Sequence, residues 1–160
     1  MTKNYTLCLI FSILILSSGC SNQVVYENYI DLNDNYWAED NQLEFAFEIQ
    51  DSGVPYDLSV YIRNGLSYPF YNLYVKYELL DDKKNTVLSS EMKETSLMDP
   101  TTGRPLGSGV GDFYNNEMNI FSDFKFQSPG KYSLKINQYM RMDSLPDITA
   151  IGLKVAKSED

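Results

Sequence analysis

The sequence Leu43-Glu44-Phe45-Ala46-Phe47-Glu48-Ile49 decides the fold, because its large apolar side chains stand at every second position. In an extended chain successive side chains point to opposite faces, so this segment has one apolar face and one polar face. Such alternation predicts a β-strand that lies between a hydrophobic core and water. The same pattern recurs at residues 58–62, 73–79, 132–136 and 151–155.

Clusters of turn-forming residues separate these segments, including Asp51-Ser52-Gly53 and Ser128-Pro129-Gly130. No stretch of ten or more residues after Cys20 has helical periodicity. We therefore expect an all-β fold, an antiparallel β-sandwich of jelly-roll-like type, built as one domain over residues 24–160. About eight strands are predicted, near residues 24–30, 43–49, 56–63, 70–80, 85–92, 119–127, 131–140 and 148–156.

Residues 94–118 break the alternation and are rich in Gly and Pro. A connection of this length is uncommon in a compact domain and is often a functional loop. The alternative is a long crossover between the two sheets of the sandwich.

The N-terminus has the order of a lipoprotein signal. Lys3 is followed by an apolar run at residues 7–16, by the small residues Ser17-Ser18-Gly19, and then by Cys20. The apolar run is about half the roughly 20 residues that a membrane-spanning helix needs. We expect residues 1–19 to be cleaved and Cys20 to carry the lipid, with residues 20–23 as a short tether. Ordinary signal cleavage and a retained helix are the alternatives, since the Leu expected at position 17 stands one residue earlier.

Composition limits the chemistry of the mature chain. It keeps 12 basic and 22 acidic side chains, a charge that repels nucleic acid and anionic headgroups. The sequence has no His, and neither of its two cysteines would remain as a free thiol, since Cys8 leaves with the signal. This excludes catalysis by Cys–His or Ser–His–Asp and removes the best zinc ligands. Carboxylates such as Glu44 and Glu48 alternate with apolar residues, which solvation explains. We expect no enzyme activity, no cofactor, no metal and no small-molecule substrate.

Two segments imitate ligand-binding loops. Residues 31–35 (Asp-Leu-Asn-Asp-Asn) begin like a calcium loop, but Tyr36 and Gln42 replace the Gly and Glu that such a loop requires. An Asx-rich turn is the alternative. Residues 107–111 (Gly-Ser-Gly-Val-Gly) imitate a phosphate loop without its Lys or its following helix, so we reject that interpretation.

Two further segments, residues 61–73 and 130–153, combine Arg, Tyr and Asn near the ends of predicted strands. Arg63 and Arg141 stand where a strand should end, and an Arg there can clamp a carboxylate or loop carbonyls. Recognition of a partner protein by one Arg–Tyr surface is the functional alternative. The candidate residues for that surface are Arg63, Asn64, Tyr68, Pro69, Asn72, Tyr139 and Arg141.

These segments, with the lipoprotein start, resemble the GldH family of gliding-motility lipoproteins from Bacteroidetes. The resemblance is carried by RNGLSYPFYNL (63–73), GRPLGSGVGD (103–112) and GKYSLKINQYMRMDSLPDITAIGLKV (130–155). It implies a small, non-enzymatic lipoprotein associated with gliding and with the type IX secretion apparatus. Only Cys20 transfers from the family as a defined site. Surface-exported lipoproteins of this phylum resemble one another in acidic residues after the cysteine, and the neutral Ser21–Val24 therefore favours the periplasmic face.

The sequence therefore predicts an envelope lipoprotein, held to the membrane by the lipid on Cys20, that supports gliding or secretion through contacts with envelope proteins. A carbohydrate- or peptidoglycan-binding lipoprotein is the alternative. It requires a co-planar row of exposed tyrosines with Trp37. Tyr68, Phe70, Tyr71 and Tyr74 could line a glycan groove, although Tyr71 fits the core of a strand.

Overall fold

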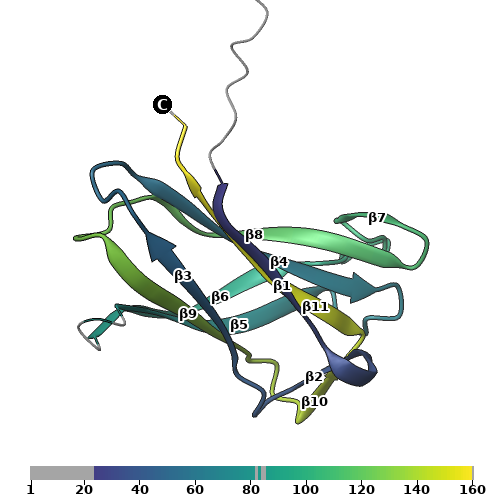
Figure 1. Cartoon of the computed structure of the whole chain (residues 1–160). Helices are drawn as coiled ribbons and strands as arrows, with labels where there is room; N and C mark the ends of the chain where they lie inside the picture. Colours follow the sequence, from purple (N-terminus) through teal and green to yellow (C-terminus); the bar gives the residue numbers. More distant parts are fainter. Residues whose placement is uncertain (1–23, 82, 84–85, 160) are drawn as a thin grey trace, which may run out of the picture.

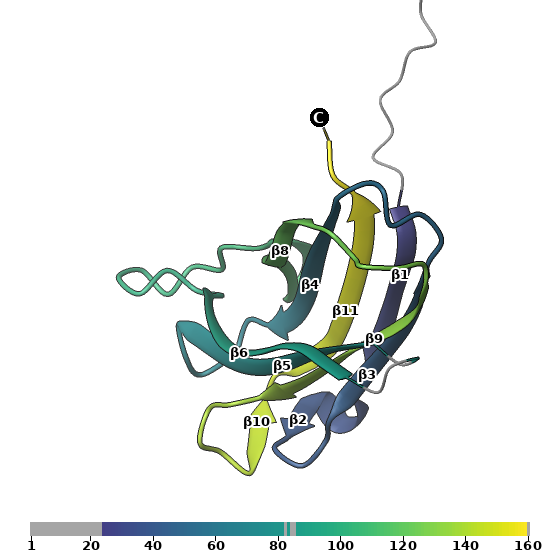
Figure 2. The ribbon, with the colours of Figure 1, turned by 90° about the vertical axis from the view of Figure 1, so that its left-hand side faces the viewer.

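The computed structural model describes residues 24–81, 83 and 86–159, which form two antiparallel sheets packed face to face (Figures 1 and 2). The five-stranded sheet has the order β1 (Val24–Asp31), β11 (Ile148–Lys157), β4 (Tyr56–Gly65), β8 (Phe113–Phe124) and β7 (Ser108–Val110). The four-stranded sheet has the order β3 (Leu43–Ile49), β9 (Gly130–Gln138), β5 (Asn72–Asp81) and β6 (Thr86–Ser96). The predicted all-β sandwich is confirmed. The predicted signal peptide, Cys20 and the predicted tether lie outside the described residues.

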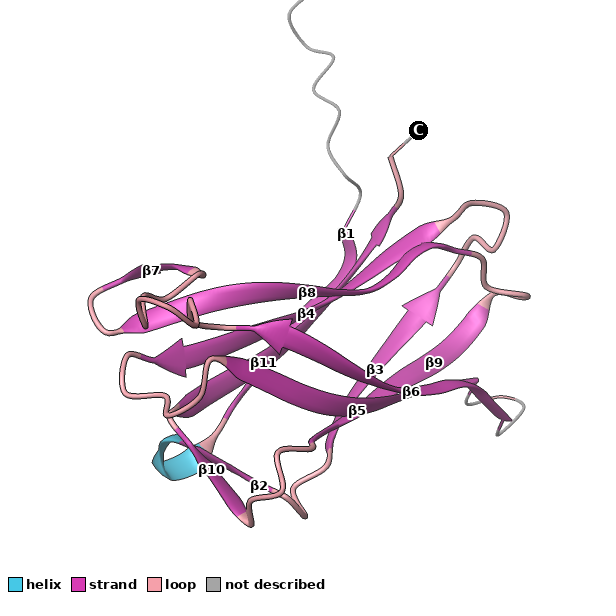
Figure 3. Ribbon diagram, turned by 180° about the vertical axis from the view of Figure 1, so that it is seen from behind, coloured by secondary structure: helices cyan, strands magenta, loops and turns pink. Residues whose placement is uncertain are grey.

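Each of the eight predicted strands is present, and β3 has the predicted bounds. The largest difference is β8, which begins at Phe113 because its first residues pair with the end of β4 and with β7. The three strands that the sequence did not predict are β2 (Tyr36–Ala38), β7 and β10 (Ser144–Pro146). Each has three residues, which is too short for alternation to be recognised. β2 and β10 pair with each other below the sandwich, next to a 3-10 turn at Asn33–Asn35 (Figure 3).

The core follows from the alternation. Leu43, Phe45, Phe47 and Ile49 are buried while the residues between them are exposed. The opposing sheet contributes Leu58, Val60 and Ile62 from β4 and the corresponding positions of β11. At about 25 cal/mol per Å² of apolar surface, this burial is the main force that holds the sheets together.

An aromatic cluster fills the end of the sandwich where β8 leads into β9. The ring of Phe126 lies 4.5 Å from Tyr132, 4.9 Å from Phe124, 5.5 Å from Tyr56 and 6.0 Å from Phe47, measured between centroids. Such pairs contribute about 0.5–1.5 kcal/mol each beyond their buried area. The cluster links both sheets, because Tyr56 belongs to one sheet and Tyr132 to the other.

The segment 94–118 is the crossover that sequence analysis gave as the alternative, since β6 lies in the four-stranded sheet and β8 in the five-stranded one. Between them the chain forms a small hairpin that stands out from the sandwich (Figure 2). The Asp99 carboxylate accepts hydrogen bonds from the backbone N–H groups of Thr101 and Thr102 and from the Thr102 hydroxyl. These bonds, with the Thr102 backbone first, hold the pKa of Asp99 below its ordinary value.

The glycines at residues 107–111 have a structural role. A Cβ on Gly109 would collide with the backbone oxygen of Phe113, and one on Gly107 would lie 2.5 Å from the backbone oxygen of Asn115. Both glycines therefore let β7 approach β8 closely. The segment 107–111 forms this short strand and the start of the turn that follows it.

Residues 31–35 end β1 and form the 3-10 turn, in which Asp34 and Asn35 have φ values of 58° and 56°. Asn and Asp tolerate this left-handed region better than other non-glycine residues, so the segment is the Asx-rich turn given as the alternative to a calcium loop. Over the described residues there is no cluster of three or more His, Cys, Asp or Glu side chains that could hold a metal ion. No helix in the same part of the chain is long and apolar enough to cross a membrane.

Candidate functional site

Three of the seven candidate surface residues are interior. Asn64, Tyr68 and Asn72 are at most 8% exposed and lie in or beside the turn that connects β4 to β5. The Tyr68 hydroxyl donates to the backbone oxygen of Asn72 (2.8 Å), and Asn116 Nδ2 donates to Asn64 Oδ1 (2.8 Å). Burial raises the pKa of Tyr68 well above its ordinary value. These side chains therefore fix a turn from inside the sandwich and offer no exposed surface.

The exposed candidates do not form one surface. Arg63 lies on the outer face of the five-stranded sheet, where its Nε donates to Asn115 Oδ1 at 3.0 Å. It borders a shallow hollow with Phe113 and with Val110, a residue that is 94% exposed. Tyr139 and Arg141 follow β9 at the end of the four-stranded sheet, on the opposite side of the sandwich, and Pro69 is exposed in the turn after β4.

Tyr139 and Arg141 line a groove of about 450 Å³. Its walls come from the two adjacent strands β5 and β6 and from the loop after β9. The lining residues, called here the Tyr–Met–Arg groove, are Tyr74, Met92, Tyr139, Met140 and Arg141. Tyr74 and Met92 face outward in their strands, because the residues on either side of Tyr74 are buried and Met92 pairs with the exposed Lys76.

The loop that carries Tyr139 and Arg141 is held from inside by Gln138, which is 1% exposed. Gln138 Nε2 donates to the backbone oxygen of Met142 (2.6 Å), and its Oε1 accepts from the backbone N–H of Met140 (2.8 Å). Both polar ends of the buried amide are thereby satisfied by the loop. The Tyr139 N–H also donates to the backbone oxygen of Tyr74 at 2.8 Å, which fixes the loop against β5.

Arg141 has a φ of 56°, a left-handed conformation that favours glycine or asparagine. Its guanidinium makes no hydrogen bond or ion pair with the described residues. Two tyrosines, Tyr74 and Tyr139, also line the groove, and the pKa of the Tyr74 hydroxyl is raised, first because it bonds to Glu94 and then through burial. Tyr74 is therefore neutral at physiological pH, and Arg141 is the only charged residue in the lining.

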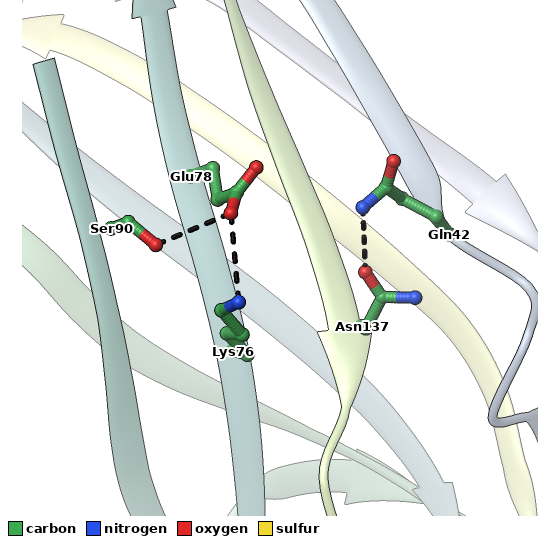
Figure 4. Close-up of polar contacts among 5 residues, drawn as sticks. All are labelled: Gln42, Lys76, Glu78, Ser90 and Asn137. Atoms are coloured by element: carbon green, nitrogen blue, oxygen red, sulfur yellow. Dashed lines mark hydrogen bonds and ion pairs between the residues drawn. The ribbon is translucent and has the colours of Figure 1, made fainter. Parts of the chain in front are cut away.

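The exposed face of the four-stranded sheet beside the groove carries polar side chains that bond to one another (Figure 4). Gln42 Nε2 donates to Asn137 Oδ1 at 2.8 Å, Ser90 donates to Glu78 at 3.3 Å, and Lys76 lies 3.6 Å from the same carboxylate. These contacts satisfy one another on the exposed face. The groove differs from them in combining apolar side chains with a cation that no described side chain neutralises.

The row of aromatics required by a carbohydrate-binding surface is not formed. Trp37 is 0% exposed and donates its Nε1 to the backbone oxygen of Asn41 (2.9 Å). Tyr29 and Tyr61 do lie together on the outer face of the five-stranded sheet, but their ring planes are inclined by 46°. The expectation that Tyr71 belongs to a strand core was wrong: it precedes β5 and is 52% exposed.

Sequence reasoning found Tyr139 and Arg141 but missed Met92 and Met140, and it named Tyr74 only for a glycan groove. The available signal was the outward position of Tyr74 and Met92 in their strands. That signal could not show that these strands are neighbours of the loop after β9.

Residues 24–155 match the sequence family described as GldH lipoprotein. The chain belongs to this family. The resemblance read from the sequence is thereby confirmed, and the match covers every residue of the Tyr–Met–Arg groove.

Two curated relatives match along nearly their whole length. The gliding motility lipoprotein GldH homolog of Christiangramia forsetii is 28% identical over 167 residues, covering 100% of both chains. The gliding motility lipoprotein GldH of Flavobacterium johnsoniae is 26% identical, covering 98% of both. A solved structure, the VP2 subviral particle of infectious bursal disease virus, is similar to 83% of this chain with a TM-score of 0.40 and 12% identity. The chain spans 32% of VP2. A likeness at this level carries no argument about function.

Proposed function

We propose that this protein is a non-catalytic, lipid-anchored envelope protein that supports gliding motility and the type IX secretion machinery through contacts with other envelope proteins. The observation that carries the proposal is membership of the GldH lipoprotein family over residues 24–155, with two relatives named for gliding motility. The family relationship supports the process, and the composition of the chain supports the absence of catalysis.

The anchor is the lipid on Cys20, which follows a signal-like N-terminus. A lipid is needed because the chain carries a net charge of −9 and gains nothing from anionic headgroups. Several acyl chains on one residue supply stable binding, since each buried CH₂ contributes about 0.8 kcal/mol. The neutral residues Ser21–Val24 favour the periplasmic face.

The residue types of the chain and its exposed side chains support a role in protein contacts, and not in catalysis on a substrate. It has no His, and two carboxylates of the four-stranded sheet lie beside lysines: Glu44 is 4.0 Å from Lys135 and Glu78 is 3.6 Å from Lys76. Among the exposed large hydrophobic residues, Met92 and Tyr139 lie in the Tyr–Met–Arg groove, and Val110 and Phe113 line the hollow beside Arg63. Aromatic residues, Met and Arg are enriched in the cores of protein interfaces, and the groove combines all three.

A deletion strain of the native host tests the proposal. We expect the strain to lose colony spreading or the export of type IX cargo, and an intact copy of the gene to restore both. Envelope permeability is measured in parallel, so that a general leak is distinguished from a specific defect. Normal spreading, normal cargo export and a normal envelope in the deletion strain would refute the proposal.

A further inference from the structure

We propose that the Tyr–Met–Arg groove binds a protein partner that inserts an apolar side chain with a carboxylate beside it. The inference rests on the proposed function, since it names the surface and the chemistry of the contact through which the protein acts. The occupant we commit to is a different protein, and a second copy of this chain, a glycan or a lipid are outcomes that would overturn it.

The composition of the groove is that of a binding hot spot. Its lining is two Tyr, two Met and one Arg, and interface cores are enriched in aromatic residues, Met and Arg. Met92 is 57% exposed and Tyr139 is 54% exposed, so both present apolar surface to water. Tyrosine contributes a large contact area at little entropic cost, and the flexible thioether of methionine adapts to an inserted side chain.

The groove is also organised in advance of binding. Gln138 fixes the backbone at Met140 and Met142, and Tyr139 is hydrogen-bonded to Tyr74 through the backbone. The Tyr74 N–H also lies 3.1 Å from the Met140 sulfur. A loop held at both ends loses little freedom on binding, and this lowers the cost of association.

The charge of Arg141 indicates the second group that the partner must carry, a carboxylate. Arg141 has a left-handed backbone conformation, with a φ of 56°, which a glycine would adopt without strain. Its side chain lines the groove, and the guanidinium has no carboxylate partner among the described residues. A guanidinium binds a carboxylate with two parallel hydrogen bonds, which makes a carboxylate beside the apolar anchor its complement.

The position of the groove suits a partner that approaches from away from the membrane. Val25 shares a hollow with Glu48 and Lys157, so β1 starts at the end of the sandwich where β9 also starts. From Gly130, β9 runs to the groove at its other end, roughly 26 Å away at about 3.3 Å per residue. The four steps from Cys20 to Val24 span at most about 14 Å. If the lipid is on Cys20, the start of β1 faces the membrane and the groove faces away from it.

The test uses the full-length protein in its native host, with a photo-reactive phenylalanine analogue at Met92. A second strain carries the same probe at Glu117, an exposed position on the outer face of the five-stranded sheet. We expect cross-linking from position 92, and not from position 117, to one segment of another envelope protein. Sequencing of that segment should show an apolar residue with an Asp or Glu within two positions.

Charge reversal then tests the pairing. Arg141→Glu should reduce the cross-link by at least about tenfold, and Arg63→Glu, the matched change on the opposite face, should leave it unchanged. Changing the partner's carboxylate to Lys should restore the cross-link to the Arg141→Glu protein. Tyr139→Ala, which changes no charge, should also reduce it, and unchanged thermal unfolding of each variant shows that the fold is retained.

Other outcomes overturn the inference. They are no cross-link at position 92, a cross-link to lipid, glycan or a second copy, a partner segment without a carboxylate, or equal effects of the two Arg variants. A deletion strain that loses gliding while the Arg141→Glu strain glides normally would reject the groove and leave the proposed function standing. A deletion strain with normal gliding and secretion would reject the proposed function itself.

Discussion

Replacing Gln138 with Met tests whether one buried amide holds the loop that carries Tyr139 and Arg141. The substitution keeps the length and approximate volume of the side chain, so it leaves no cavity. It removes the hydrogen bond from Gln138 Nε2 to the Met142 oxygen and the one from the Met140 N–H to Gln138 Oε1. Two backbone groups of the loop are then left without their partners.

The expected cost follows from those two groups. A polar group that loses its partner inside a protein costs about 1–3 kcal/mol, and the loop lies near water, so each takes the lower half of that range. The sum is about 2–4 kcal/mol. For a domain of this size, with a urea dependence of about 2 kcal/mol per M, the unfolding midpoint should fall by roughly 1–2 M.

The assay is urea unfolding followed by tyrosine and tryptophan fluorescence, with amide hydrogen exchange on the same samples. The matched control is Gln42→Met, which removes an exposed hydrogen bond of 2.8 Å to Asn137 (Figure 4). A surface change of this kind should cost less than about 0.5 kcal/mol. In the Gln138 variant, exchange at Met140 should accelerate before global unfolding. Equal midpoints for the two variants, or unchanged exchange at Met140, would show that Gln138 does not organise the loop.

Three further predictions concern the rest of the fold. Trp37→Ala should lower the free energy of unfolding by about 3–5 kcal/mol, measured in urea, because it empties a fully buried site; a loss below about 1 kcal/mol would contradict that burial. Gly109→Ala should cost about 1–3 kcal/mol and speed amide exchange in β7, because its Cβ would meet the backbone of Phe113; unchanged exchange would contradict the close approach. The Asp99 carboxyl should titrate below its ordinary pKa of 3.8 when followed by NMR. Its stabilisation of the crossover hairpin is then complete above that ordinary pKa and is lost as pH falls through the lowered value, whereas a midpoint at or above 3.8 would argue against the hydrogen bonds.

The sandwich could be predicted from the sequence because one half-buried face leaves a period of two. The segment 43–49 shows this clearly, since all four of its large apolar side chains are buried and its bounds match β3. The three-residue strands β2, β7 and β10 leave no such period. Trp37 in β2 was considered as an exposed residue of a glycan-binding surface, because the residues next to it in the sequence do not show that it pairs with Leu145.

The candidate site was harder to predict, because polar residues are assigned to the surface by default. Asn64 is fully buried, and its amide partner Asn116 is 52 positions away in the sequence. Tyr139 was named in the sequence analysis because it stands with Arg141 near the end of a predicted strand. The role of Gln138 could not be found in this way, since its partners are backbone atoms of a loop whose conformation the sequence does not reveal.

The proposed function requires that this domain acts where a lipid on Cys20 holds it. The most direct test complements a deletion strain with two forms made at equal levels. One is the native protein, and the other carries Cys20→Ser behind an ordinary cleavable signal, which releases the domain in soluble form. We predict that the anchored form restores spreading and cargo export and that the soluble form restores neither. Full restoration by the soluble form would contradict the account.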